Sequence, residues 1–278
     1  MGYDYKSIKK ILKDKSLFEG KKILTLGNLF PFLKEKEKKD LTKEGIYFGK
    51  KEDFSKSLFV NKIGASLVHT LDVSDYESAE IIANLNKSVD KLMHEKYDVI
   101  VDFGTLEHIS NLQAGLQNIF DILKNNGIYY FALPSNNWQN HGFYQFSPTY
   151  FSDICNQNNS LKLKEIQLSI NNKYYELLKN SNFAYLALIN SHHPTGISGI
   201  IQKEKSFTID MDFIQGRYVQ DHNNFKKIIN DQNKVKNSQL KLIKKFIITK
   251  LIFPILKSNY LPFELRYNFG KFLGSLKK

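Results

Sequence analysis

The most constraining feature of the sequence is a series of short apolar runs that end at a glycine or an acidic residue. Residues 22–26 precede Gly27, residues 97–103 precede Gly104, and residues 66–73 include an acid near their end. Short apolar runs bounded by turn-forming residues are typical of buried strands. The chain is therefore predicted to fold around a sheet whose strands end in tight turns or at polar groups.

Helical periodicity alternates with these runs. Residues 106–124 carry apolar side chains at helical spacing, and residues 125–127 (NNG) are expected to end that helix. Strands joined through helices indicate right-handed crossovers and a mostly parallel sheet, so we predict an α/β, doubly wound fold. The other expected elements are a basic helix over 5–13, a surface helix or loop over 34–56, and strands over 81–85, 128–133, 161–169 and 183–189.

Composition excludes several classes of protein. A single cysteine, Cys155, excludes internal disulfides and metal sites built from several cysteines. No uncharged apolar stretch reaches the roughly 18 residues that a membrane-spanning helix needs. The first 20 residues alternate lysines with apolar residues and lack the apolar core of a signal peptide. We therefore expect a cytoplasmic protein.

Positive charge is concentrated near the C-terminal end of the sequence. The net charge is +12, and residues 226–278 alone carry 13 basic side chains against two acidic ones. This change in composition predicts an α/β domain over residues 1–225 and a basic, helical extension over residues 226–278.

The extension has two interpretations. Residues 240–253 mix lysines with apolar residues, as a helix lying on the inner face of an anionic membrane would. Alternatively, their apolar side docks on the domain or on a second copy in a homodimer, which is the interpretation that we favour. Nucleic acid is not an expected partner, because only Arg217 and Arg266 offer the forked guanidinium group suited to phosphates and base edges.

Two strand ends point to a nucleoside-containing ligand. In open parallel sheets, ligands bind beyond the carboxyl ends of the strands. Gly27 would let a ligand approach the backbone, and Asp72, which ends the next strand, would accept hydrogen bonds from both hydroxyls of a ribose. A nicotinamide-dependent dehydrogenase is a further alternative, but the chain lacks the Gly-x-Gly-x-x-Gly motif of that class.

The order of these motifs resembles that of class I S-adenosylmethionine-dependent methyltransferases. The resemblance covers roughly residues 20–190 and rests on residues 23–27, Asp72, residues 97–104, the Leu-Glu-His of residues 106–108 and residues 123–127. It implies a seven-stranded Rossmann-like sheet, S-adenosylmethionine as the cofactor and methyl transfer as the activity. By position, it also implies that Gly27 contacts the cofactor through its backbone, Asp72 binds the ribose, Asn84 and Leu85 meet the adenine edge, and Gly104 lies near the sulfonium.

The loop after the first of these strands departs from the family pattern. The family usually has Gly-x-Gly-x-Gly there, whereas residues 27–31 read GNLFP, with one glycine. Side chains then stand where the methionine part of the cofactor would press on the backbone. This departure supports a second hypothesis, a methyltransferase-like binding or scaffold protein that has lost its cofactor.

Two histidines are candidate catalytic residues. His108 follows the fourth strand and His141 lies in the loop after the fifth. Histidine is the side chain best suited near neutral pH to accept a proton from an acceptor hydroxyl. Each also has a structural interpretation, His108 as packing at the start of a helix and His141 as bonding to a loop carbonyl. The resemblance implies an acceptor hydroxyl on a small molecule or on a sugar of a surface-glycan precursor.

No metal site is predicted. His192 and His193 stand near Asp210 and Asp212 in the sequence. However, adjacent side chains on a strand point to opposite faces, so the two histidines are not expected to reach one ion.

Overall fold

The fold is known from a computed structural model. It describes residues 2–50, 53–75, 77–171, 173–177, 191–209, 211, 213, 215–216, 262, 264–268 and 271. The predicted strand over 183–189, and the predicted helix over 240–253, lie outside the described residues. Within the described residues, no helix is long and apolar enough to cross a membrane.

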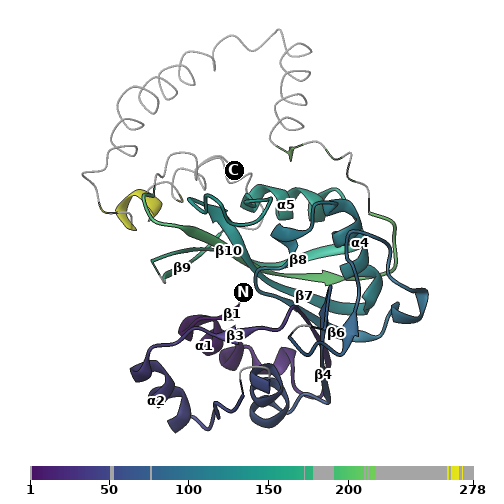
Figure 1. The fold of residues 1–278 in the computed structure, drawn as a ribbon. Helices are drawn as coiled ribbons and strands as arrows, with labels where there is room; N and C mark the ends of the chain where they lie inside the picture. The colour runs from purple at the N-terminus through teal and green to yellow at the C-terminus, as the bar shows by residue number, and fades with distance from the viewer. Residues whose placement is uncertain are drawn as a thin grey trace, which may run out of the picture.

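An eight-stranded sheet runs through the centre of the protein (Figure 1). Its strands are, in spatial order, β5 (Ile81–Ile82), β4 (Leu67–Asp72), β2 (Lys22–Leu26), β6 (Tyr97–Asp102), β7 (Leu123–Asn136), β10 (Thr195–Lys203), β8 (Leu161–Ile170) and β9 (Lys173–Glu176). The strands from β5 to β7 pair in parallel, and β10, β8 and β9 join them antiparallel. The predicted α/β class and mostly parallel sheet are confirmed. Within the described residues the sheet has one strand more than the seven expected, because β8 and β9 form a hairpin at one edge.

Helices cover both faces of this sheet, as a doubly wound fold requires (Figure 1). They are α1 (Tyr5–Lys13), α2 (Glu35–Lys43), α3 (Phe54–Lys56), α4 (Leu112–Ile122) and α5 (Pro148–Asn156), with short turns of other helix types at η1 (Lys15–Leu17), η3 (Ser57–Ile63), η4 (Lys91–Met93) and η5 (Leu106–His108). Strand β6 shows how the two cores divide. Val99 and Val101 pack with α1, while Ile100, between them, packs with α4 and α5, because successive side chains of a strand point to opposite faces.

The predicted helix over residues 106–124 is wrong in its continuity. It consists of η5 and α4, and Asn111 begins α4 by accepting a hydrogen bond from the amide of Ala114 at 3.2 Å. Helix α4 ends at Ile122, before the end expected at residues 125–127, so Gly127 does not terminate it. Gly127 is instead required by close packing. A Cβ atom there would lie 2.9 Å from the carbonyl oxygen of Lys124 and 3.0 Å from that of Asp98, so only glycine allows this close approach.

Strand β10 was missed from the sequence. Its residues include Gly196 and Gly199, which weaken the apolar pattern typical of a strand. Gly199 lies where a Cβ atom would come within 2.7 Å of the ring of Phe131 on the neighbouring strand. The carbonyl oxygen of Glu165 on β8 would also lie 2.8 Å away, so the packing of β10 between β7 and β8, rather than local propensity, explains the glycine. A small sheet of β1 (Gly2–Tyr3) and β3 (Phe30–Pro31) was also not predicted.

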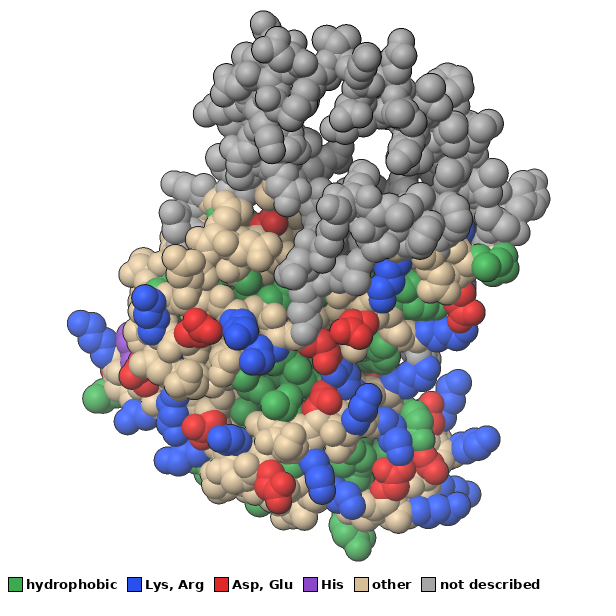
Figure 2. Space-filling model, turned by 180° about the vertical axis from the view of Figure 1, so that it is seen from behind, with side chains coloured by type: hydrophobic (Ala, Val, Ile, Leu, Met, Phe, Trp, Pro, Cys, Tyr) green, Lys and Arg blue, Asp and Glu red, His purple; other side chains and the backbone are tan. Residues whose placement is uncertain are grey.

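The few described residues of the C-terminal extension contact the domain. Tyr267 is buried, its hydroxyl donates to the carbonyl oxygen of Glu176 at 2.6 Å, and its ring lies 4.6 Å from that of Tyr175. These contacts and an ion pair between Lys173 and Glu264 hold the described residues of the extension against β9, while a helical extension over residues 226–278 stays a prediction. On the face seen in Figure 2, basic and acidic side chains are interspersed over the described surface rather than separated by sign.

Candidate active site

The tips of β2 and β6 lie side by side and are joined by a hydrogen bond. The Thr105 hydroxyl, just after β6, donates to the carbonyl oxygen of Leu26 at the end of β2, over 2.8 Å. Gly27 and Gly104 follow these two strands, are buried, and have φ angles of +74° and +104°. L side chains rarely adopt such angles, so both turns favour glycine and leave bare backbone at the strand ends. Both glycines thus follow adjacent parallel strands at one edge of the sheet, and their contacts with a cofactor stay predictions.

Asp72 ends β4, the strand on the other side of β2. One of its carboxylate oxygens accepts hydrogen bonds from the amides of Val73 at 2.6 Å and Ser74 at 3.4 Å, and the side chain is half-buried. The local turn thus fixes the carboxylate at the strand tip, next to Gly27.

Asn28 crosses between the two loops that follow β2 and β4. Its side chain is buried, and its amide nitrogen donates to the carbonyl oxygen of Glu77 over 2.7 Å. Its amide oxygen is buried and has no hydrogen-bond partner among the residues that the structure describes. At the position where the family usually has glycines, this chain therefore has the Asn28 side chain, which bonds to the second loop and keeps its amide oxygen available as an acceptor. Leu29 points instead into the core beside α1.

The predicted adenine-edge residues lie on the loop after β5. Leu85 is buried in the core, whereas Asn84 is exposed and its side-chain oxygen accepts from the amide of Asn86 at 3.0 Å. Asn86 in turn accepts from the Ser110 hydroxyl at 2.8 Å and the Asn111 amide at 2.9 Å. These bonds hold the loop against the start of α4, at the same end of the sheet as Gly27 and Asp72.

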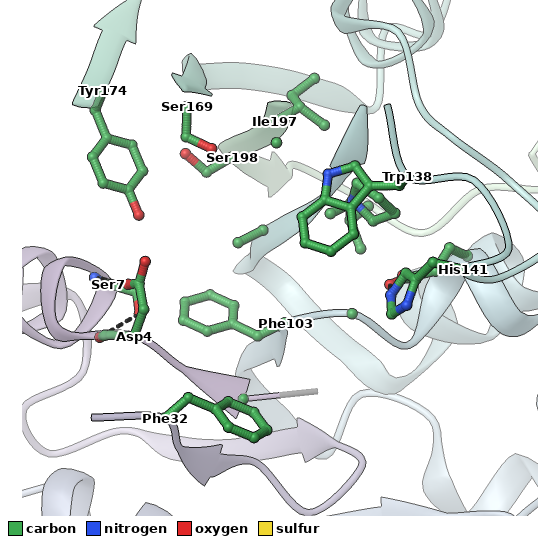
Figure 3. Close-up of a pocket in the computed structure, with 17 residues that line it drawn as sticks. Asp4, Ser7, Phe32, Phe103, Trp138, His141, Ser169, Tyr174, Ile197 and Ser198 are labelled. Atoms are coloured by element: carbon green, nitrogen blue, oxygen red, sulfur yellow. Dashed lines mark hydrogen bonds and ion pairs between the residues drawn. The ribbon is translucent and has the colours of Figure 1, made fainter. Parts of the chain in front are cut away.

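A cavity of about 350 Å³ opens beside Gly104. The N-terminal segment, the loop after β7 and the strands β8 to β10 line it, and Figure 3 shows His141 and Trp138 on one side and Asp4, Ser7 and Tyr174 on the other. Of the predicted site residues, only Gly104 and His141 line this cavity. Gly27, Asp72, Asn84, Leu85 and His108 do not, so their roles in cofactor binding and catalysis stay predictions.

Glu107 was not among the predicted site residues, although it lies at the centre of the site. Its side chain is fully buried beside the cavity, and neither carboxylate oxygen has a hydrogen-bond partner within the described residues. Burial, reinforced by the nearby charge of Asp102, raises the pKa of Glu107 to about 8. The Leu-Glu-His motif was recognised in the sequence, but the burial of the Glu107 side chain depends on tertiary packing, which the motif does not predict.

Asp102, at the end of β6, is also fully buried but has partners. Its carboxylate accepts from the Tyr129 hydroxyl at 2.7 Å and from the Thr105 amide at 2.7 Å. Desolvation by burial outweighs these bonds and raises the pKa of Asp102 to about 6.

His108 and His141, the two predicted catalytic residues, are brought together around Glu107. Their ring centroids lie 5.3 Å apart. The Nε2 atom of His141 lies 3.5 Å, and that of His108 lies 3.9 Å, from the Oε1 atom of Glu107. Burial, and then the neighbouring His141, lower the pKa of His108. The ligand-type atoms of the three residues lie within 4.8 Å of one another, close enough to serve one metal ion.

His192 and His193 are exposed, and Asp210 and Asp212 lie outside the described residues. The expectation that these four residues form no metal site stays a prediction. The metal-type cluster that the structure does present, around Glu107, was not considered from the sequence.

The sequence matches the family model described as a methyltransferase domain over residues 48–188, just over half of the chain. The chain belongs to the methyltransferase domain family. The predicted class I, S-adenosylmethionine-dependent methyltransferase is thereby confirmed at the level of family, and the matched region of this methyltransferase contains every predicted site residue except Gly27.

Solved structures of methyltransferases resemble this one at low identity. An S-adenosylmethionine-dependent methyltransferase from Aquifex aeolicus has 11% identity and a TM-score of 0.39, with 69% of this chain and 88% of that one covered. The 1,6-didemethyltoxoflavin-N1-methyltransferase of Burkholderia thailandensis, solved with S-adenosylhomocysteine, has 10% identity and a TM-score of 0.42, with 72% and 78% covered. None of the curated proteins matches the chain by sequence.

Proposed function

We propose that this methyltransferase transfers the methyl group of S-adenosylmethionine to a hydroxyl of a small molecule or sugar held in the cavity beside Gly104. The observation that carries the proposal is the position of Glu107 and His141, which line the cavity next to Gly104, just after β6. Donor and acceptor would then meet at the tip of that strand.

The residues at the tips of β2 and β4 fit the donor. Gly27 offers backbone without a side chain, and Asp72 offers a carboxylate to the ribose hydroxyls. The buried amide oxygen of Asn28, which lacks a partner in the described part of the chain, would accept a hydrogen bond from the donor's ammonium or hydroxyl groups. In this proposal the Asn28 side chain binds the donor at the position where the family usually has glycines.

Methyl transfer needs little covalent chemistry from the protein, because S-adenosylmethionine supplies an already activated methyl group. The acceptor oxygen attacks the methyl carbon, the carbon–sulfur bond breaks, and its electron pair stays on sulfur in S-adenosylhomocysteine. The hydroxyl proton must also leave, and His141, which lines the cavity beside Glu107, is placed to promote its departure. Holding the two reactants in line contributes up to about 7–11 kcal/mol in favourable cases.

The cavity has the lining expected for a hydroxyl-bearing acceptor. Phe32, Phe103 and Trp138 give it apolar, aromatic walls, and Asp4 and Tyr174 give it polar groups on the opposite side (Figure 3). Burial raises the pKa of Tyr174, so its hydroxyl keeps its proton and can donate a hydrogen bond. Aromatic faces with a few convergent polar groups suit a sugar or a similar polyol, which supports a role in surface-glycan synthesis.

Calorimetric titration with S-adenosylhomocysteine tests the donor site. We expect binding by the full chain, and its loss in Asp72→Ala. The matched control is Asp75→Ala, which removes an exposed acid three residues along the same loop and should leave binding intact. No binding at millimolar S-adenosylhomocysteine, or equal losses in the two variants, would contradict the proposal.

A second candidate, a binding protein that has lost its cofactor, is favoured by one observation. The Asn28 side chain bridges to Glu77 across the tips of β2 and β4, where the adenosine half of the donor would lie. If that bridge closes the crevice, the protein binds no S-adenosylhomocysteine, and Asn28→Gly gains this binding.

A further inference from the structure

The Glu107 carboxyl group is buried without a hydrogen-bond partner among the described residues. Its side chain is fully buried, yet neither oxygen accepts a hydrogen bond from any described residue. An unpaired buried carboxylate costs several kcal/mol unless it is neutralised or paired with a cation.

Two imidazole groups face the same carboxylate oxygen. The Nε2 atoms of His141 and His108 lie 3.5 Å and 3.9 Å from the Oε1 atom of Glu107, too far for hydrogen bonds in this arrangement. The space between these three atoms is therefore bounded by one oxygen and two nitrogens, all of which are good metal ligands.

We propose that Glu107, His108 and His141 bind one divalent first-row transition metal ion of the zinc type, at the wall of the acceptor cavity. Two imidazoles and one carboxylate are a ligand set that suits zinc, cobalt or iron, whereas magnesium favours oxygen ligands. The ion would neutralise the buried carboxylate that no described donor satisfies.

The distances suit this assignment after small side-chain movements. The three ligand atoms lie within 4.8 Å of one another, and around an ion with bonds of about 2.1 Å they would lie about 3–3.5 Å apart. The side chains of His108 and His141 are 41% and 40% exposed, so their rings have room to move toward the oxygen. Three protein ligands leave further positions on the ion open toward the cavity, as in catalytic rather than structural metal sites.

The backbone holds the two histidines in place. The carbonyl oxygen of Glu107 accepts hydrogen bonds from the amides of Phe143 at 2.7 Å and Tyr144 at 3.2 Å. These bonds fasten the loop after β7 onto η5, so His141 lies over Glu107 although 34 residues separate them in the sequence. Because His108 is the residue next to Glu107, both histidines are positioned by the same turn.

The role of the ion rests on the proposed function, although its binding does not. An acceptor hydroxyl bound to the ion would lose its proton more readily, because a divalent cation stabilises the resulting alkoxide. That proton passes to water, and the oxygen then attacks the methyl carbon as the carbon–sulfur bond breaks. The two histidines would contribute by holding the ion.

Titration with Co²⁺ tests the site directly. The full chain, without a histidine tag and dialysed against a chelator, is titrated with Co²⁺ while the visible absorption of the bound ion is recorded, and Zn²⁺ is then added to displace it. We expect one ion per chain, and binding at least roughly tenfold weaker in His108→Ala, His141→Ala and Glu107→Gln. The matched control is His94→Ala, because His94 also lies near a carboxylate, 4.0 Å from Asp121, but away from the cluster.

Each outcome bears on the inference. Loss of binding in the three cluster variants, with His94→Ala unaffected and all variants still folded by thermal denaturation, supports the site. Absence of Co²⁺ and Zn²⁺ binding at millimolar metal overturns it, as does unchanged binding in any of the cluster variants. The same preparation is titrated with S-adenosylhomocysteine, so that failure of the metal site and failure of the donor site are seen separately.

Discussion

Gly142 lies directly against Glu107. A Cβ atom at Gly142 would come within 2.8 Å of the Cγ atom of Glu107 and 3.0 Å of its carbonyl oxygen, and the φ angle of Gly142 is +70°. Both the space and the backbone conformation therefore require glycine at this position. The contact explains how the loop after β7 packs close enough to bring His141 to the cluster.

Gly142→Ala is expected to lower the free energy of unfolding by about 2–4 kcal/mol, because strain in the left-handed region and overpacking add together. It should also weaken Co²⁺ binding, since His141 is displaced. Gly20→Ala is the matched control, because Gly20 has a φ angle of +69° but a Cβ atom there would meet nothing within 4 Å. Urea denaturation measures the loss of stability in each variant. A loss in Gly20→Ala as large as that in Gly142→Ala would contradict a role for the contact with Glu107.

Asp102→Asn is expected to change how stability depends on pH. The folded-state pKa of Asp102 is raised from 3.8 to about 6 by burial. As the pH rises from about 4 to about 6, the folded state keeps a proton that the unfolded state has released, so the free energy of unfolding decreases. Above pH 6 the full cost is about 3 kcal/mol, and it is absent in the asparagine variant. Relative to the wild type, Asp102→Asn should therefore become more stable between pH 4 and pH 6.5, measured by urea denaturation at each pH.

Asp98→Asn serves as the control of opposite sign. Burial alone would raise the pKa of Asp98, but the ion pair with Lys124 at 2.9 Å and the amide of Lys22 together lower it. A lowered pKa stabilises the folded state above the unfolded-state value, and this stabilisation is lost as pH falls. Asp98→Asn should thus be less stable than the wild type at neutral pH, and similar trends in the two variants would contradict this account.

Thr105→Val is expected to loosen the joined tips of β2 and β6. It removes the hydroxyl that donates to the carbonyl oxygen of Leu26, at a cost of about 1 kcal/mol in the free energy of unfolding. Because Gly27 and Gly104 flank this bond, affinity for S-adenosylhomocysteine should fall as well. In the control Thr42→Val, the lost bond is to Lys38 within exposed helix α2, so S-adenosylhomocysteine affinity should not change.

Asn28→Ala is expected to weaken S-adenosylhomocysteine binding by about tenfold, which corresponds to the loss of one hydrogen bond to a buried acceptor. Calorimetry measures the change. A tighter complex would instead show that the Asn28 side chain obstructs the crevice, which would favour the second candidate function.

The sequence alone determined the parallel half of the fold and the positions of the strand tips. Strands β2, β4 and β6 were predicted because buried parallel strands need continuous apolar runs, and their glycine or acidic ends are equally local features. Gly27, Asp72 and Gly104 therefore fall at one sheet edge, as the motif order implied. The family itself follows from that order, which depends on sequence and not on contacts.

Tertiary structure decided the antiparallel half and the chemistry of the site. The glycines of β10 carry no strand signal, because they allow close contacts with β7 and β8 on either side. Glu107, His108 and His141 became one cluster only when the loop after β7 folded over η5. Burial and the distance between residues far apart in the sequence are properties of packing, and local patterns do not encode them. For this reason the sequence predicted each histidine individually as a catalytic residue, but it did not predict the buried carboxylate of Glu107 between them.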